Sequence, residues 1–118
     1  TKKRINNASL YDQNLSQISS IKIPQRVKTN KEVFHLYTFQ VEQRDDLSKM
    51  LQENGIDAKI HYPVPMHLQP ASKKYNYLEG EFPVAEKLCS KTISLPVHEF
   101  VSDNEITFVC NLIKNFYK

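Results

Sequence analysis

Apolar residues spaced three or four positions apart predict several amphipathic helices along this chain. The first covers residues 5–18, and the second covers residues 44–54 and ends at Asn54-Gly55, a pair typical of a left-handed helix stop. A third opens at Pro83 and continues to residue 92, and its apolar stripe is expected to face the core. That stripe comprises Val84, Ala85, Leu88 and Cys89.

The clearest helix is predicted at the end of the chain. Ser102 and Glu105 have the spacing of a capping box, in which each side chain pairs with a free backbone N–H of the other residue. The apolar positions that follow all fall on one side of a helix: Ile106, Val109, Cys110, Ile113, Phe116 and Tyr117. We therefore expect this helix to be buried along that side.

Between the helices, alternating apolar and polar residues predict β-strands. Residues 33–41 are rich in aromatic and β-branched side chains, and His35 is expected to be half-buried among them. Residues 56–62 alternate in the same way, and residues 21–24 and 93–96 fit short strands that end at proline. This order of elements predicts an α+β fold, a small and mostly antiparallel sheet with helices on one face.

Composition and charge narrow the class of protein. The 118 residues suffice for one domain, with 40% hydrophobic and 25% charged residues as in soluble globular proteins. No apolar run approaches the roughly 20 residues that span a bilayer. The net charge of +3 comes from dispersed lysines, and the two cysteines, Cys89 and Cys110, fit buried positions in a reducing compartment. We expect a cytoplasmic protein that binds neither membrane nor nucleic acid.

The most distinctive segment runs from His61 to Pro70, which contains three prolines, two histidines and a tyrosine. Proline fixes φ and favours an extended residue before it, so this loop should be rigid, with Tyr62, Val64 and Gln69 extended. Alternation along residues 56–62 places Tyr62 on the core face and His61 on the opposite one. The segment is either a binding loop or a connector that wraps the surface.

Several kinds of chemistry find no support in the sequence. The only glycines are Gly55 and Gly80, neither in a phosphate-binding motif. The histidines match no familiar zinc spacing, so no metal site is predicted. Both cysteines are expected to be buried and poorly nucleophilic, and the lysines have polar surroundings that give no reason for Schiff-base reactivity. No complete catalytic set is therefore predicted in this chain.

Seven short motifs in one order carry a family resemblance. They are Phe34-His35-Leu36-Tyr37, Arg44-Asp45-Asp46-Leu47, Asn54-Gly55-Ile56, the segment from His61 to Pro70, Phe82-Pro83-Val84-Ala85-Glu86, Ser94-Leu95-Pro96 and the capped last helix. In this order they resemble the C-terminal domain of the DegT/StrS-type sugar-nucleotide aminotransferases, which use pyridoxal phosphate. The resemblance implies the small domain of a fold-type I aminotransferase.

The resemblance also implies a function for the parent enzyme. Such an enzyme moves an amino group from an amino acid, commonly glutamate, to a nucleotide-linked keto sugar in polysaccharide or lipopolysaccharide biosynthesis, and works as a homodimer. By analogy His61, Tyr62 and His67 would contact the sugar nucleotide or shape its pocket. No catalytic residue is expected in this chain, because the Schiff-base lysine and the groups that hold the cofactor would lie upstream in a large domain. The fragment alone is expected to be inactive.

Two hypotheses follow for the chain as a whole. In the first, residues 1–118 are a single C-terminal small domain, and residues 1–20, which read as helix without an N-cap, are the end of a helix linked to the large domain. This hypothesis predicts an exposed apolar patch beside the first helix. In the second, the chain is a free-standing α+β ligand-binding or interaction module without catalysis, with a closed surface and its own pocket.

Overall fold

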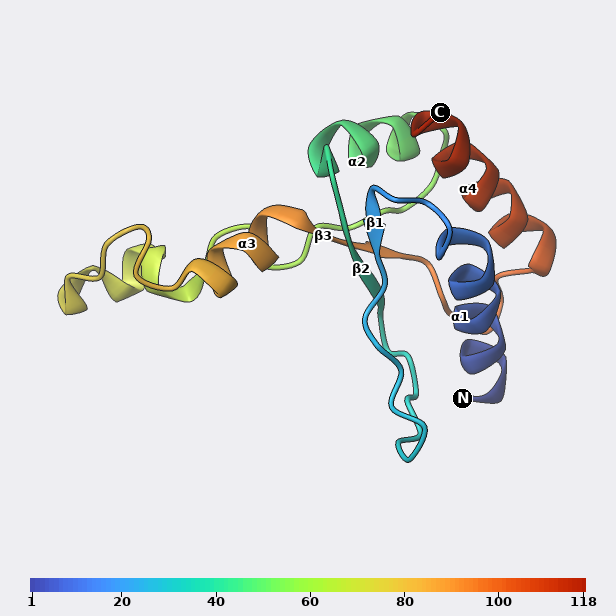
Figure 1. Cartoon of the computed structure of the whole chain (residues 1–118), viewed down its shortest axis with the longest axis horizontal. Coiled ribbons are helices and arrows are strands. Elements are labelled where there is room, and N and C mark those ends of the chain that lie inside the picture. The colour runs from blue at the N-terminus through green and yellow to red at the C-terminus, as the bar shows by residue number, and fades with distance from the viewer.

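Three antiparallel strands, paired in the order β1-β2-β3, form the centre of the fold (Figure 1). In the computed structural model, which describes residues 1–118, they are β1 (Ile21–Lys22), β2 (Tyr37–Val41) and β3 (Thr92–Leu95). Tyr37 lies opposite Leu95 across the β2–β3 pair. The predicted small antiparallel sheet is confirmed.

Four α-helices and two short 3₁₀-helices complete the chain: α1 (Lys2–Leu15), α2 (Arg44–Glu53), η1 (Met66–Leu68), η2 (Pro70–Tyr75), α3 (Pro83–Lys91) and α4 (Asp103–Phe116). The helices α1 and α4 lie side by side, and together with α2 they supply the residues that pack on one face of the sheet (Figure 1). The α+β architecture predicted from the sequence is therefore confirmed. No helix combines the length and the apolar character needed to cross a bilayer.

The core forms where β2 meets the helices. Tyr37, Phe39 and Val41 of β2 are buried, whereas the residues between them are half-buried. The ring of Tyr11 in α1 stacks on Tyr37 with 4.7 Å between ring centroids, and its hydroxyl donates to the carbonyl of Pro96 at 3.0 Å. Four residues of the predicted stripe in α4 are buried: Ile106, Val109, Cys110 and Ile113. The capping box of Ser102 and Glu105 is present as predicted.

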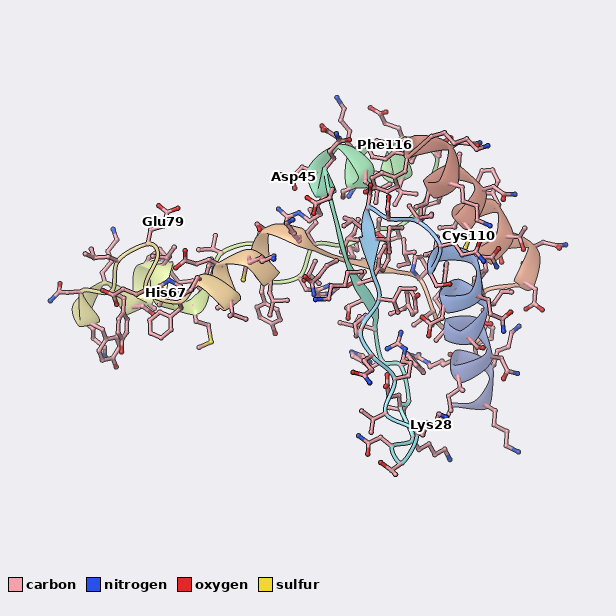
Figure 2. The ribbon with its side chains drawn as sticks, in the orientation of Figure 1. Lys28, Asp45, His67, Glu79, Cys110 and Phe116 are labelled. Atoms are coloured by element: carbon pink, nitrogen blue, oxygen red, sulfur yellow. The ribbon has the colours of Figure 1, made fainter.

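Residues 62–91, here called the arm, extend away from the sheet and its helices (Figures 1 and 2). The elements η1, η2 and α3 contain no buried residue. The radius of gyration is 15.6 Å, against roughly 13.5 Å for a compact domain of this length. The arm is thus a projection whose side chains pack mostly on one another.

The prediction that α3 buries an apolar stripe is wrong for this chain. Val84 is 72% exposed and Leu88 is 42% exposed, and Cys89 is half-buried rather than buried. The stripe exists, but no other element of the chain covers it. Exposed apolar residues lie on the arm and also in the segment before β2, where Val27 lines a cavity with Ile5 of α1.

The strand predicted over residues 33–41 begins only at Tyr37. Phe34 has a φ of 50°, a left-handed conformation that interrupts the extended chain, and His35 is exposed rather than half-buried. The guanidinium of Arg4 in α1 donates to the carbonyls of Phe34 and His35, each at 3.3 Å. These carbonyls therefore bond to a side chain instead of a neighbouring strand.

The strand predicted over residues 56–62 is reduced to one bridge, between Lys59 and Ser94 of β3. Ile56 and Ala58 are buried as alternation requires, but Tyr62 is 76% exposed and does not face the core. Tyr62 has a φ of 54°, so the extended conformation expected before Pro63 is also wrong there. Gln69, with φ of −71° and ψ of 152°, is extended as predicted.

Candidate functional site

His61 is held at the edge of the sheet by a buried serine. The Nδ1 atom of His61 lies 3.0 Å from the Oγ atom of Ser94, and Ser94 is 3% exposed. The backbones of Lys59 and Ser94 exchange two hydrogen bonds, of 3.0 and 2.8 Å, which fix the chain two residues before His61. The side chain predicted to bind substrate is therefore anchored to the sheet.

A groove of about 290 Å³ opens beside His61. Arg4, Lys59 and His98 contribute basic side chains to its wall. Two carboxylates offset part of this charge: Asp57 lies 2.6 Å from the Lys59 ammonium. The other, Glu99, lies 3.4 Å from the Arg4 guanidinium. Among the side chains that line the groove, hydrogen-bond donors thus outnumber carboxylates.

Three histidines line this groove: His35, His61 and His98. No group of three or more His, Cys, Asp or Glu side chains in the chain is close enough to hold a metal ion. The fourth histidine, His67, lies on the arm (Figure 2) and lines a different groove. The histidines weighed as possible metal ligands in the sequence do not converge on one point.

His67 makes a side-chain contact within the arm. Its Nε2 atom lies 2.9 Å from Oε1 of Glu86 in α3, and its side chain is only 7% exposed. The imidazole also packs against Phe82, with 4.7 Å between ring centroids. One of the two ring nitrogens of His67 is thus already paired.

Glu86 gathers further hydrogen bonds from the same turn of the arm. The backbone N–H of Gly80 donates to both carboxylate oxygens at 2.9 and 3.0 Å, and that of Phe82 donates at 3.3 Å. Gly80 has a φ of 92°, a conformation that side-chain-bearing residues rarely adopt. Burial opposes ionisation of Glu86, but the bonds from Gly80, Phe82 and His67 outweigh it and hold its pKa below the ordinary range.

Tyr62 and His67 share a mostly apolar groove of about 580 Å³ on the arm. Met66, Phe82 and Leu88 also line it, and all three are exposed. The structure thus brings together two of the three predicted site residues. It places the third, His61, in the separate groove beside Ser94.

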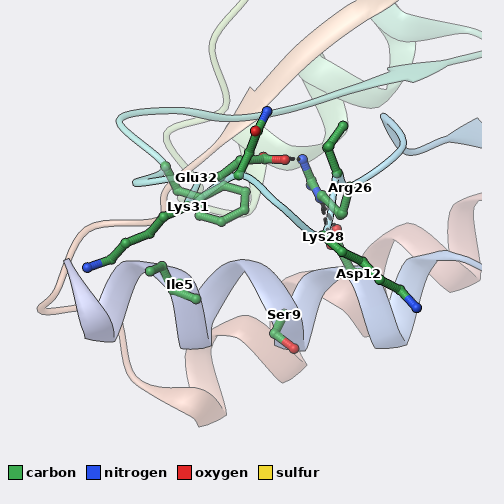
Figure 3. A pocket seen from close by; sticks show the side chains of 10 residues that line it. Ile5, Ser9, Asp12, Arg26, Lys28, Lys31 and Glu32 are labelled. Carbon is green, nitrogen blue, oxygen red and sulfur yellow. Dashed lines mark hydrogen bonds and ion pairs between the residues drawn. The ribbon is translucent and has the colours of Figure 1, made fainter.

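A charged network that the sequence did not reveal joins α1 to the segment before β2 (Figure 3). The guanidinium of Arg26 donates to both carboxylate oxygens of Asp12 at 2.9 and 3.0 Å, and to Glu32 at 3.0 Å. The hydroxyl of Tyr37 donates to the same Asp12 at 2.7 Å. Burial, together with this bond, raises the pKa of Tyr37 well above its ordinary value.

A cavity of about 430 Å³ lies beside this network, between α1 and residues 26–34 (Figure 3). The hydrogen bond to Asp12 is the main cause of a raised pKa of Arg26. The ion pairs are made within the network itself, and they fasten the segment to α1. We therefore treat this cavity as structural.

Comparison with known sequences decides the family. The sequence model of the DegT/DnrJ/EryC1/StrS aminotransferase family matches residues 1–114. The chain belongs to this family. Its fold is that of a DegT-type aminotransferase domain, and it corresponds to the C-terminal part of these enzymes, as the motifs predicted.

Individual relatives match most or all of the chain. A pleiotropic regulatory protein of Geobacillus stearothermophilus is 33% identical over 120 residues, which cover 100% of this chain and 32% of the relative. The dTDP-3-amino-3,4,6-trideoxy-alpha-D-glucose transaminase of Streptomyces venezuelae is 38% identical over 90 residues, which cover 76% of this chain and 24% of the transaminase.

Among solved structures, S. venezuelae DesV in complex with a ketimine intermediate superposes with a TM-score of 0.93 and 31% identity. The match covers 99% of this chain and 32% of DesV. The chain therefore spans about a third or less of the length of these relatives.

Ser94 and Glu86 of this DegT-type domain make contacts that the sequence did not predict. Both residues lie in the motifs that carry the family resemblance. Ser94 was part of the Ser94-Leu95-Pro96 motif, but its contact with His61 depends on pairing between distant segments. Glu86 offers a local signal, since it lies in the first turn of α3, where an acidic side chain can meet free backbone N–H groups. Neither residue was assigned a role from the sequence.

Proposed function

We propose that this chain is the small domain of a pyridoxal-phosphate-dependent aminotransferase that transfers an amino group from glutamate to a nucleotide-linked keto sugar. Membership of the DegT/DnrJ/EryC1/StrS family over residues 1–114 is the observation that carries the proposal. In that enzyme, residues 1–118 form one C-terminal domain, and residues 1–20, which contain α1 (Lys2–Leu15), connect it to a large domain.

The substrate class and setting follow from the names of relatives. The S. venezuelae transaminase is named for a dTDP-linked amino sugar, and a Bacillus subtilis relative is named as a spore coat polysaccharide biosynthesis protein. We propose a nucleotide-linked keto sugar as substrate and polysaccharide or lipopolysaccharide biosynthesis as the setting.

Within this domain we assign substrate contact to His61 and Tyr62 and pocket shaping to His67. His61 faces a donor-rich groove that suits the oxygen atoms of a sugar nucleotide. Tyr62 is 76% exposed and lines the apolar groove of the arm. His67 acts through its bond to Glu86 and its packing on Phe82, which hold the wall of that groove in place.

The residues present do not by themselves form a pyridoxal phosphate site. No lysine of the chain is buried, whereas a Schiff-base lysine works from a desolvated position. The two glycines, Gly55 and Gly80, lie in turns and do not form a phosphate loop. We therefore derive no step through the cofactor and assign its binding, including the Schiff-base lysine, to the proposed large domain.

We further propose that the complete enzyme is a cytoplasmic homodimer. The apolar residues of the arm are exposed in this chain, and an enzyme with a large domain and a second subunit offers surfaces that would cover them. Apolar surface of this kind is typical of contacts between domains or subunits.

The first test compares the purified 118-residue chain with the product of the complete gene. Each is mixed with pyridoxal phosphate, and intact mass and visible absorbance are recorded. We expect a Schiff-base absorbance band in the complete product and none in the chain alone. Amino transfer from glutamate to a set of dTDP- and UDP-linked keto sugars is then followed by mass spectrometry.

Variants of the complete enzyme test the assigned residues. His61→Leu and Tyr62→Phe are expected to raise KM for the sugar nucleotide about fivefold or more, because each removes one hydrogen-bonding group. Glu79→Gln serves as the control, since Glu79 is exposed on the arm and makes no hydrogen bond. A complete gene product that consists of this chain alone and binds no cofactor would instead support a free-standing binding module.

A further inference from the structure

The proposed function assigns no role to the buried hydroxyl of Ser94. We propose that Ser94 is a positioning residue that orients the ring of His61 and fixes its tautomer, so that Nε2–H points to the groove as a donor for an oxygen atom of the sugar nucleotide. The proposal rests on the proposed function for the identity of that ligand only.

Backbone pairing brings the two side chains together. Lys59 and Ser94 form the single bridge between residues 56–62 and β3, with hydrogen bonds in both directions. In an extended chain, residues two positions apart point to the same side, so His61 follows Lys59 on the side of Ser94. Diagonal neighbours across paired strands are within reach of a long side chain. The 3.0 Å distance between Nδ1 of His61 and Oγ of Ser94 fits this arrangement.

The direction of this hydrogen bond follows from burial. Ser94 is 3% exposed, and Nδ1 of His61 is the only partner of its hydroxyl group. A buried O–H donor without an acceptor costs about 1–3 kcal/mol, whereas the serine oxygen has two lone pairs and tolerates an unused one. The hydroxyl therefore donates to Nδ1. In a neutral imidazole, the proton must then lie on Nε2.

This tautomer determines what the groove offers a ligand. Nε2–H joins the Arg4 guanidinium and the Lys59 ammonium, which also line the groove and carry no acceptor. Oxygen atoms of a phosphate or a sugar hydroxyl can accept from all three groups. The opposite tautomer would place an acceptor there, with which an ionised phosphate oxygen cannot form a hydrogen bond.

The first experiment reads the tautomer without any substrate. The 118-residue chain is labelled with ¹⁵N-histidine, and long-range ¹H–¹⁵N correlations report which ring nitrogen of His61 carries the proton. His61→Gln assigns the signal. We expect the Nε2–H form in the wild type and in Ser94→Thr, and a mixture containing Nδ1–H in Ser94→Ala. An unchanged tautomer in Ser94→Ala, or an Nδ1–H wild type, would overturn the proposal.

The second experiment measures kinetics of the complete enzyme with its keto-sugar substrate. Ser94→Ala is expected to raise KM roughly fivefold to tenfold while kcat changes less than about twofold, and Ser94→Thr is expected to restore most of the loss. Ser90→Ala is the control, because the Ser90 hydroxyl lies on α3 and bonds only to the carbonyl of Lys87. Unchanged KM in Ser94→Ala would overturn the role in substrate binding.

Failure of the proposed function has a different signature. A complete gene product without transaminase activity would refute the proposed function. The tautomer measurement would still decide whether Ser94 fixes the tautomer of His61. The two inferences can therefore fail independently.

Discussion

At the scale of single residues, the carboxylate of Glu86 organises more of the arm than any other side chain. It accepts hydrogen bonds from His67 and from the backbone of Gly80 and Phe82, and so ties η1 and the turn before α3 to the helix itself. No apolar core stabilises this part of the molecule. The shape of the groove that Tyr62 and His67 share therefore depends on this ionised group together with the packing of His67 on Phe82.

This dependence predicts a response to acid. The pKa of Glu86 is lower in the folded chain than its ordinary value of 4.5, so its stabilising contribution is present above pH 4.5 and is lost as the pH falls through the lowered folded-state value. We expect backbone amides of residues 76–86 to exchange faster with solvent as the pH drops through this window, after correction for intrinsic exchange rates.

Two variants control this measurement. Glu86→Gln should show faster exchange already at neutral pH and little further change in acid. Glu79→Gln, which removes an exposed carboxylate without a hydrogen bond on the same arm (Figure 2), should behave like the wild type. Equal acid responses in wild type and Glu86→Gln would show that another group governs the arm.

The two thiols should differ in reactivity. Burial raises the pKa of Cys110 to about 11, against the opposing effect of the Lys114 charge, and its side chain lies in the core. Cys89 is half-buried and lines the groove of the arm. With iodoacetamide at pH 8, we expect alkylation at Cys89 first and at Cys110 only after unfolding in urea. Peptide mass spectrometry detects alkylation at both sites. The folded Cys89→Ser variant should stay unlabelled.

At the scale of elements, helices with the same sequence period differ in what they contact. The stripes of α3 and α4 are both amphipathic, but that of α4 is buried and that of α3 is not. Periodicity reports that a helix has an apolar side, and it does not report which surface covers that side. This is why the sequence predicted both helices correctly but misplaced the environment of α3.

The cap of α4 gives a prediction for one element. The Ser102 hydroxyl accepts from the backbone N–H of Glu105 at 3.3 Å, and the Ser102 N–H donates to the Glu105 carboxylate at 2.7 Å. Ser102→Ala removes the first bond and should cost about 1 kcal/mol, which lowers Tm by about 4 °C. Ser19→Ala, at an exposed position without a side-chain hydrogen bond, should leave Tm unchanged in the same thermal scan.

Local patterns predicted the elements better than they predicted the site. The helices and the capping box depend on neighbours in sequence, and the residue types there were sufficient, whereas the strands predicted over residues 33–41 and 56–62 were shortened or reduced to one bridge. The contacts of His61 with Ser94 and of Arg26 with Asp12 join segments 33 and 14 residues apart. No spacing rule encodes such pairs, because they depend on strand register and on the conformation of loops with left-handed residues such as Phe34 and Tyr62.

At the scale of the whole molecule, the chain consists of a packed sheet with three helices and a projecting arm. The overall dimensions are 48 × 34 × 25 Å, and the arm lies along the longest direction (Figure 1). The sequence pattern predicted one domain and gave no indication of the projecting arm. The residues of the arm have the pattern of a loop followed by a helix, as in a compact domain. The chain spans about a third of the length of the Geobacillus stearothermophilus relative, and in the enzyme proposed above the remaining part would offer surfaces for the arm to contact.

This shape predicts that apolar residues of the arm contribute little to the stability of the isolated chain. Val84→Ser should change the free energy of unfolding in urea by less than about 0.5 kcal/mol, because Val84 is 72% exposed. Ile106→Val, which removes one methylene group from a fully buried position, should cost about 1 kcal/mol. A comparable loss in both variants would mean that α3 is packed against the domain in solution.

The neighbouring positions of α1 and α4 also constrain how this domain is made on the ribosome. The two helices pack together although about 100 residues separate them, and the ion pair between Lys3 and Asp103 spans the same interval. The buried side of α1 has no complete partner until α4 has left the exit tunnel. Between the synthesis of α1 and that of α4, the apolar side chains of α1 that pack on α4 are therefore uncovered, and apolar surface exposed in this interval is prone to aggregation.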